Sequence, residues 1–244
     1  MTGPIFALVL LALPAPVSVE RGDEEFARLH YPLAEAYYDS ALGASGDSAD
    51  VLWRLARVYV CVADVAPRDQ ELDLYRRAEA FAHRCIEADS TKAQGHTWRA
   101  AALGNIAMFE GGKTKVKLCR LIRDELESSI RLDSTDDIAY SILGSFYMAL
   151  GNVSWIERRL ASLFLGTLPE GGYSESERAL KKAVALAPGV IRHHFELGKL
   201  YRAEDRPREA LEEFNKVAAL PQLLANDERT QRAAAEMARD LAGE

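Results

Sequence analysis

One spacing of large and small residues recurs along the chain and constrains its fold more than any other feature. The spacing is a large residue, a Leu three positions on, a small residue directly after that Leu, and a Tyr three positions further. It starts at Leu52, Tyr140 and His194, with Ala56, Gly144 and Gly198 as the small residues. Because residues at i, i+3, i+4 and i+7 share one helix face, each segment predicts a helix that a neighbour can approach closely.

A second spacing follows each of these segments: a small residue, a large residue four positions on, and a small residue three further. It is clear at Ala210-Phe214-Val217 and Ser176-Leu180-Ala183, and weaker at Ala78-Ala82-Cys85 and Ile122-Leu126-Ser129. Such helix pairs are typical of tetratricopeptide repeats. The sequence therefore predicts an all-α, tetratricopeptide-like right-handed solenoid of about four degenerate repeats over residues 24–241. The first helices of these repeats are predicted near 50–62, 93–108, 137–150 and 191–204. An irregular helical bundle is the alternative fold.

The repeats are longer than usual. Their first helices are anchored at Leu52, His96, Tyr140 and His194. The spacing between successive anchors exceeds the usual period of about 34 residues. We therefore expect insertions between paired helices at 63–69, 109–115 and 151–173, the last holding an extra helix that starts at Trp155. Residues 24–42 predict a single capping helix, and residues 227–241 a polar, solvent-facing end cap.

The composition narrows the possible functions. The chain of 244 residues carries a net charge of −7, so it has no overall field that attracts nucleic acid. Its three cysteines, Cys61, Cys85 and Cys119, have neither zinc-site nor disulfide-framework spacing. No cofactor or metal site is expected.

The N-terminus carries an uncharged apolar run, Ile5–Leu13, ended by Pro14. The run is too short for a transmembrane helix, which needs about 20 residues, and we expect no transmembrane segment. It has the length of a signal-peptide core, although no positive charge precedes it. Residues 1–19 are thus predicted to be a signal peptide of an exported, periplasmic or secreted protein. The alternative is a docked apolar segment of a cytoplasmic protein.

Residues 98–241 also resemble one particular family, the regulators of microtubule dynamics. The resemblance rests on Gly95-His96-x-Trp98, on Ala139-Tyr140-x-x-Leu143-Gly144, on Leu186-Ala187-Pro188-Gly189, and above all on Ser154-Trp155 followed by a charged helix. It implies an all-helical repeat domain that binds partners. It also implies association with microtubules and, for the member that tethers membranes, phospholipid binding and transfer. The chain departs from the family in lacking a long membrane anchor or coiled coil.

The histidines do not indicate catalysis. His96 and His194 occupy the same repeat position, which a large aromatic residue normally fills, so packed rings are expected. No carboxylate partner that could orient either ring is evident in the sequence, and the chain has no nucleophile-elbow motif. We therefore predict no catalytic residue and no enzyme.

The repeat template places ten side chains on the concave side of the solenoid, and we call them the groove set. They are Trp53, Arg57, Gln94, Thr97, Ser141, Ser145, Arg192, Phe195, Lys199 and Arg202. The last four form a basic face, and arginine suits carboxylates or phosphates. This predicts a non-enzymatic scaffold that binds a partner protein or peptide in the groove. A merely solvated face is the alternative interpretation. An alternative function is lipid or apolar-ligand binding and transfer, with the Trp155 insertion enclosing a cavity along the groove.

A second basic group lies on one predicted helix: Lys113, Lys115, Lys117, Arg120 and Arg123. Their spacing distributes them over two helix faces. An anionic partner, such as a phospholipid headgroup or an acidic tail, is one interpretation. Solvated surface charge is the other.

Overall fold

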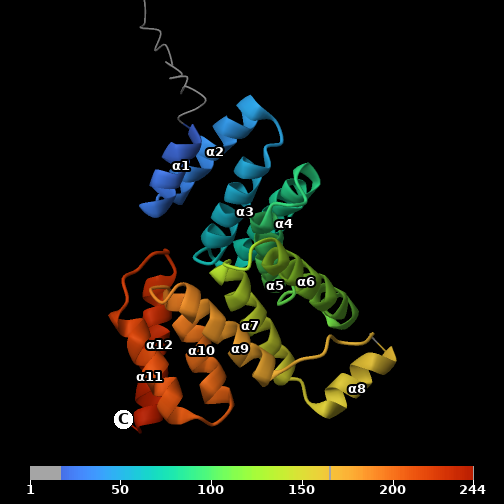
Figure 1. Cartoon of the computed structure of the whole chain (residues 1–244), viewed down its shortest axis with the longest axis vertical. Coiled ribbons are helices and arrows are strands. Elements are labelled where there is room, and N and C mark those ends of the chain that lie inside the picture. The colour runs from blue at the N-terminus through green and yellow to red at the C-terminus, as the bar shows by residue number, and fades with distance from the viewer. Residues whose placement is uncertain (1–17, 165, 244) are drawn as a thin grey trace, which may run out of the picture.

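The computed structural model describes residues 18–164 and 166–243, which form twelve helices and no strand (Figure 1). The helices are α1 (Ser18–Ala27), α2 (Tyr31–Ser45), α3 (Ala49–Ala63), α4 (Arg68–Ala88), α5 (Ala93–Ile106), α6 (Gly112–Leu132), α7 (Asp137–Gly151), α8 (Trp155–Phe164), α9 (Tyr173–Leu186), α10 (Ile191–Ala203), α11 (Pro207–Ala219) and α12 (Asp227–Ala242). Of the predicted apolar segment 1–19, all but Ser18 and Val19 lies outside the described residues, so its role stays a prediction.

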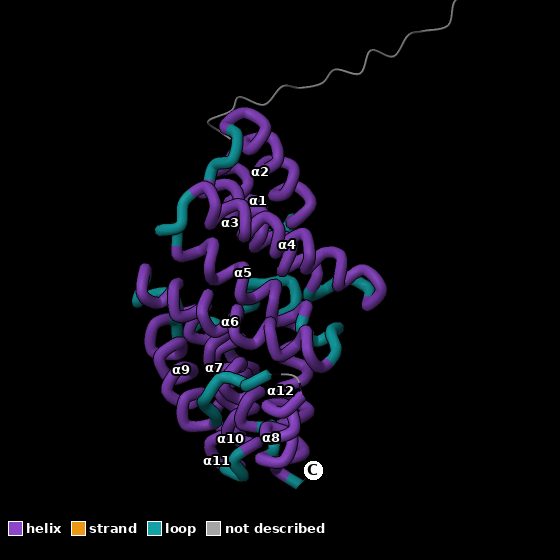
Figure 2. Tube along the Cα trace, turned by 90° about the vertical axis from the view of Figure 1, so that its right-hand side faces the viewer, coloured by secondary structure: helices purple, strands orange, loops and turns teal. Residues whose placement is uncertain are grey.

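The helices pack as successive pairs: α1 with α2, α3 with α4, α5 with α6, α7 with α9, and α10 with α11. Figure 2 shows how short loops join them into one stack. The predicted tetratricopeptide-like solenoid is confirmed, and so is the inserted helix, α8, which stands at the edge of the body in Figure 1. The apolar residues form four successive clusters along the stack instead of one central core, as expected for repeats that stabilise their neighbours.

The small residues of the repeated spacing lie where paired helices touch. A Cβ atom added to Gly144 would collide with Leu180, and one added to Gly198 would collide with Phe214. The large residue of each second helix therefore fills the space that the glycine leaves open. This contact explains why the two spacings occur together in the sequence.

The prediction of a single capping helix at 24–42 is wrong. The chain turns at Leu29, which has a left-handed φ of 64°, and this separates α1 from α2. The ring of Tyr38 packs on Gly22 as Leu180 packs on Gly144. The helices α1 and α2 thus form a fifth pair, with the same small-to-large contact as the pairs α7–α9 and α10–α11.

At the predicted insertions 63–69 and 109–115 the structure has only short connectors, and the other residues of these segments belong to the neighbouring helices. Helices α4 and α6 have 21 residues each, whereas α9 and α11 have 14 and 13. The additional residues therefore lengthen the second helices of two repeats, and short connectors remain at 64–67 and 107–111.

The connector between α11 and α12, residues 220–226, returns to the first helices of the stack. The amide of Ala225 donates to the hydroxyl of Tyr31 at 3.1 Å, and Asn226 Nδ2 donates to Asp64 Oδ2 at 3.3 Å. Leu224 packs against the cluster that holds Tyr31. In Figure 1 the red connector accordingly lies directly below the blue helices. The two ends of the stack are in contact.

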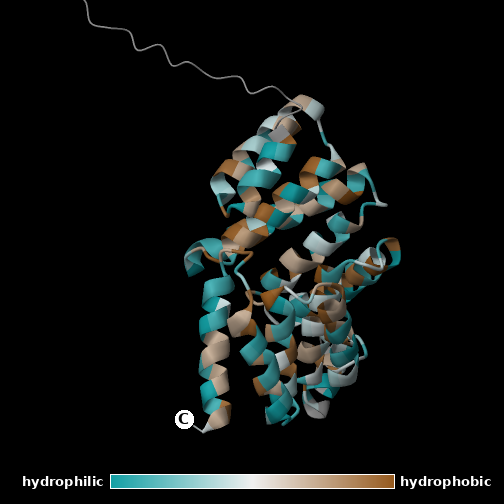
Figure 3. Cartoon of the chain, turned by 60° about the vertical axis from the view of Figure 1, so that its left-hand side comes forward, coloured by the Kyte–Doolittle hydropathy of each residue, from teal (hydrophilic) through white to brown (hydrophobic). Residues whose placement is uncertain are grey.

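Helix α12 closes the other side of the last pair. Its buried residues are Asp227 and Ala234, and polar and apolar residues alternate along its length in Figure 3. Asp227 accepts the amides of Leu223 and Leu224, both at 2.8 Å, and so fixes the shape of the connector.

Candidate functional site

The groove set differs in how accessible its side chains are. Thr97 and Ser141 are fully buried. The hydroxyl of Thr97 contacts Ser129 at 2.6 Å and Asp136 at 2.5 Å, so it serves the packing of α5, α6 and α7. Arg202 is exposed, and the other seven residues are half-buried. The solenoid thus places two of the ten side chains in contacts between helices instead of on a surface.

Arg57 connects the first helix pair to the second. Its guanidinium lies 3.7 Å from the centre of the Phe26 ring and donates to Asp23 at 3.2 Å and to Tyr38 Oη at 3.1 Å. Burial by itself raises the pKa of Asp23, but hydrogen bonds from Arg54 and Tyr38 bring it below the usual value. Arg57 therefore has its counter-ion within the chain.

The basic face of α10 is also partly neutralised. Lys199 Nζ lies 3.0 Å from both carboxylate oxygens of Glu196, which is itself 8% exposed. Glu196 accepts a further hydrogen bond from Ser145 on α7 at 3.1 Å. The Lys199 ammonium also lies 5.4 Å from the ring of Phe195. Lys199 is thus held in a contact between α7 and α10.

Arg192 and Arg202 are different, because neither forms an ion pair with another described residue. The Nε atom of Arg192 is buried without a hydrogen-bond partner in this part of the chain. The pKa of Asp64 is raised, because burial outweighs the opposing effects of a hydrogen bond from Tyr75 and of the charge of Arg192. The structure therefore brings the start of α10 close to the end of α3, across the predicted groove.

Two buried histidines form equivalent contacts that the sequence analysis missed. His96 Nδ1 lies 2.5 Å from Glu125 Oε2 and its Nε2 lies 3.1 Å from the carbonyl oxygen of Ser90. His194 repeats this with Glu213 at 2.6 Å and the Pro188 carbonyl at 3.0 Å.

Both nitrogens of each ring thus lie within hydrogen-bond distance of an oxygen acceptor. The hydrogen bond to Glu125 raises the pKa of His96. The expectation that these rings lack an oriented partner is therefore wrong. Each ring is buried, and both of its nitrogens are engaged in contacts within the chain. The missed signal is a Glu directly before the large residue of the second helix, at Glu125-Leu126 and Glu213-Phe214.

The second predicted basic group divides into two parts. Lys113, Lys115 and Lys117, which we call the α6 lysines, are exposed and form no ion pair or hydrogen bond with any described residue. Arg120 instead donates to the carbonyl oxygen of Thr167, at 3.1 and 2.9 Å. Arg123 pairs with acidic neighbours on its own helix. Three free cations therefore remain at the start of α6.

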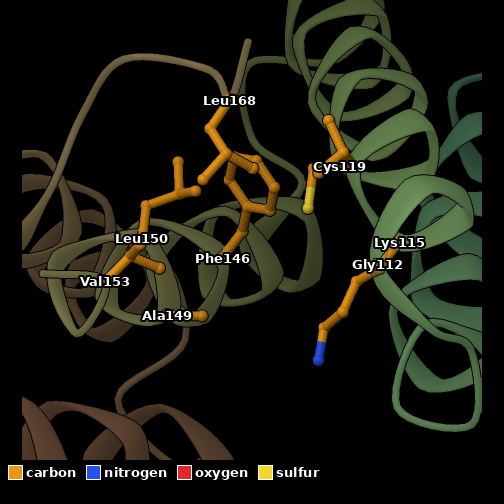
Figure 4. Close-up of a pocket in the computed structure, with 9 residues that line it drawn as sticks. Gly112, Lys115, Cys119, Phe146, Ala149, Leu150, Val153 and Leu168 are labelled. Carbon is orange, nitrogen blue, oxygen red and sulfur yellow. The ribbon is translucent and has the colours of Figure 1, made fainter. Parts of the chain in front are cut away.

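An apolar cavity of about 240 Å³ lies beside the α6 lysines. Figure 4 shows it between the start of α6, the end of α7 and Leu168. Its lining comprises Gly112, Lys115, Val116, Cys119, Phe146, Ala149, Leu150, Val153 and Leu168. None of the groove set lines it, so this cavity does not run along the predicted groove. The side chain of Trp155, expected to enclose a cavity there, lies outside the described structure.

Within residues 18–164 and 166–243, no group of three metal-ligating side chains comes together. Among the helices of these residues, none combines the length and the apolar composition that a membrane-spanning helix needs.

The paired helices and their small-to-large contacts define a tetratricopeptide-repeat protein. The family described as regulator of microtubule dynamics protein 1-3 matches residues 20–242, and the chain belongs to this family. Human regulator of microtubule dynamics protein 2 is 26% identical over 188 residues, which cover 76% of this chain and 46% of that protein. The bovine protein 1 is 26% identical over 212 residues, which cover 86% and 65%. The chain thus spans about half to two thirds of the length of these relatives.

Solved structures agree on the fold. A tetratricopeptide-repeat protein of Thermus thermophilus superposes with a TM-score of 0.66 at 18% identity, covering 92% of this chain and 98% of that chain. Yeast Tom70 superposes with a TM-score of 0.58 at 14% identity, covering 94% and 40%.

Proposed function

We propose that this protein is a non-enzymatic scaffold that binds a segment of a partner protein on the concave side of its solenoid. Membership of the family and the repeat fold support a role in protein interaction. The observation that carries the proposal is the pair Arg192 and Arg202, the α10 cations that form no ion pair with a described residue. With Phe195 between them on the same helix face, they offer charge and apolar contact to an acidic, partly apolar segment.

The test is recovery of partners from a lysate of the native host by the purified chain. We expect Arg192→Glu/Arg202→Glu to lose the partners that the wild type recovers. A matched control is Lys182→Glu/Arg208→Glu, which changes the same charge at two exposed positions on α9 and α11. Thermal melting of both variants shows that they are folded. Equal recovery by the groove variant and the wild type would contradict the proposal.

The lipid alternative receives less support from the geometry. The cavity of about 240 Å³ is smaller than the roughly 300–1,000 Å³ usual for small-molecule sites, and it lies away from the groove set. Native mass spectrometry of the purified chain distinguishes the two functions. Lipid that copurifies in stoichiometric amount would favour the alternative over the scaffold.

We also propose that residues 1–19 direct export. N-terminal sequencing of the mature protein from its native host tests this. A mature chain that starts after about residue 15 supports export, and one that retains Ile5–Leu13 contradicts it.

A further inference from the structure

We infer that the α6 lysines and the adjacent cavity form a second docking surface, which binds an acidic protein segment through one bulky apolar side chain. This surface lies outside the groove set, so the inference goes beyond the proposed function and does not depend on it.

The α6 lysines lie within the first six residues of α6, and the first turn of this helix contains no acidic residue. Cations are disfavoured at this end of a helix, where the backbone dipole is positive. No carboxylate of the described chain compensates for them, although 37 acidic residues are present. Carboxylates from a partner would therefore meet a positive potential that the chain itself leaves unneutralised.

The cavity beside the α6 lysines is apolar and large enough for one side chain. Val116, Phe146 and Leu150 give it apolar walls, and Lys115 lies on its lining beside them. At about 240 Å³ it exceeds the roughly 150 Å³ of an engineered apolar cavity that admits benzene. It can thus hold one aromatic or branched apolar side chain, which is the kind of anchor on which protein interfaces depend.

Hydrogen bonds join the segments that form the walls of the cavity. Arg120 of α6 holds the carbonyl of Thr167, next to Leu168. Arg158 of α8 donates to the carbonyl oxygens of Pro169 at 3.0 Å and Leu150 at 2.9 Å. These bonds tie the segment after α8 to α6 and α7. Leu168 accordingly covers one side of the cavity in Figure 4.

The arrangement of the lysines favours a peptide over a membrane surface. Lys115 lies on the cavity lining. Lys113 and Lys117 lie two positions before and after it, about 200° around the helix. A flat membrane meets one face of the helix. A flexible segment with several carboxylates can reach both faces while its apolar side chain enters the cavity.

The experiment uses a fluorescein-labelled synthetic octapeptide with one central Phe among Asp and Glu residues, titrated with the full chain by fluorescence anisotropy. We expect saturable binding that weakens as salt is added. Replacing the Phe by Ser in the peptide should weaken binding about tenfold, the value of one buried aromatic anchor.

Two variants of the protein test the two halves of the surface. Lys113→Gln/Lys115→Gln/Lys117→Gln should weaken binding about tenfold, whereas the control Lys182→Gln/Arg208→Gln/Arg239→Gln, with the same net charge, should not. Ala149→Trp, at an exposed position on the lining, should block the cavity, and Ala218→Trp on α11 is its control.

Several results would overturn the inference. One is peptide binding that the lysine variant or Ala149→Trp leaves unchanged. Another is lysine-dependent binding to vesicles of phosphatidylserine and phosphatidylcholine without binding of the peptide. Loss of binding in Arg192→Glu/Arg202→Glu would place the peptide in the groove, so this pair separates failure here from failure of the proposed function.

Discussion

The two basic regions of the molecule look alike in sequence and differ in structure. On the predicted concave side, Arg57 is bound by Asp23 and Lys199 by Glu196. At the start of α6, three lysines have no counter-ion within the described chain. A cluster of positive residues therefore indicates an available charge only after the carboxylates of neighbouring helices have been placed.

The prediction with the largest expected effect tests whether a cation of the groove set stabilises the fold. Arg57→Ala removes the contact with Phe26 and a hydrogen bond to Asp23, and should lower the free energy of unfolding by about 2 kcal/mol. Urea unfolding followed by circular dichroism measures this. Arg178→Ala, at an exposed i,i+3 pair, is the control and should cost less than about 0.5 kcal/mol. Equal losses in both variants would remove the distinction between the two regions.

The second prediction converts a paired cation into a free one. Glu196→Gln should release Lys199 and lower stability by about 1 kcal/mol, because the ion pair and part of the Ser145 contact are lost. Acetylation of lysines followed by mass spectrometry measures the release. In the wild type the α6 lysines should react faster than Lys199, and the variant should narrow the gap. An unchanged rate at Lys199 would show that Glu196 does not protect it.

The third prediction concerns His96, which is buried against Glu125. Its pKa is raised in the folded chain, because Glu125 accepts its proton in a hydrogen bond. Its contribution to stability is therefore complete below a pH of about 6.5, the value for an unfolded histidine, and is lost as the pH rises through the folded pKa. Urea unfolding between pH 6 and 9 should show this decrease.

His96→Gln should remove this part of the pH dependence. The exposed His83→Gln should preserve it. The groups that face His96 are Glu125, the Ser90 carbonyl and the nearby Arg99, which itself binds Glu125 at 2.7 Å. A pH profile identical in the wild type and His96→Gln would refute the assignment.

The smallest effect is expected at the other region. Lys113→Gln/Lys115→Gln/Lys117→Gln should change the free energy of unfolding by less than about 0.5 kcal/mol, because no contact of the fold is lost. Thermal and urea unfolding measure it. A loss comparable to that of Arg57→Ala would mean that these lysines stabilise the fold.

Much of the fold could be predicted because the contacts between paired helices follow from the spacing of large and small residues within short segments. Gly144 and Gly198 mark close approaches, and their partners follow at fixed distances. The pair of α1 and α2 was not predicted because Arg21 and Glu25 occupy the positions where the pattern has Leu and Tyr. Gly22 nevertheless contacts the large residue of the second helix, as Gly144 and Gly198 do. The insertions were misjudged since polar residues suit both a loop and the solvent-facing extension of a helix.

The candidate site was less predictable. Helical spacing fixes the direction of a side chain relative to its own helix, but not how closely the next repeat covers it. Thr97 and Ser141 are therefore buried despite their template positions. The counter-ion of Arg57 lies 34 residues away, on a helix that the sequence pattern did not reveal.

The contact of Ala225 with Tyr31 joins residues 194 positions apart. A linear array of repeats can lose its terminal units one at a time, because each unit depends on its immediate neighbours. Here the first and last units also protect each other, so fraying at one end exposes surface at the other. The array should consequently lose its structure in one cooperative step. It should also form slowly for a helical protein, since closing the ring requires the whole chain.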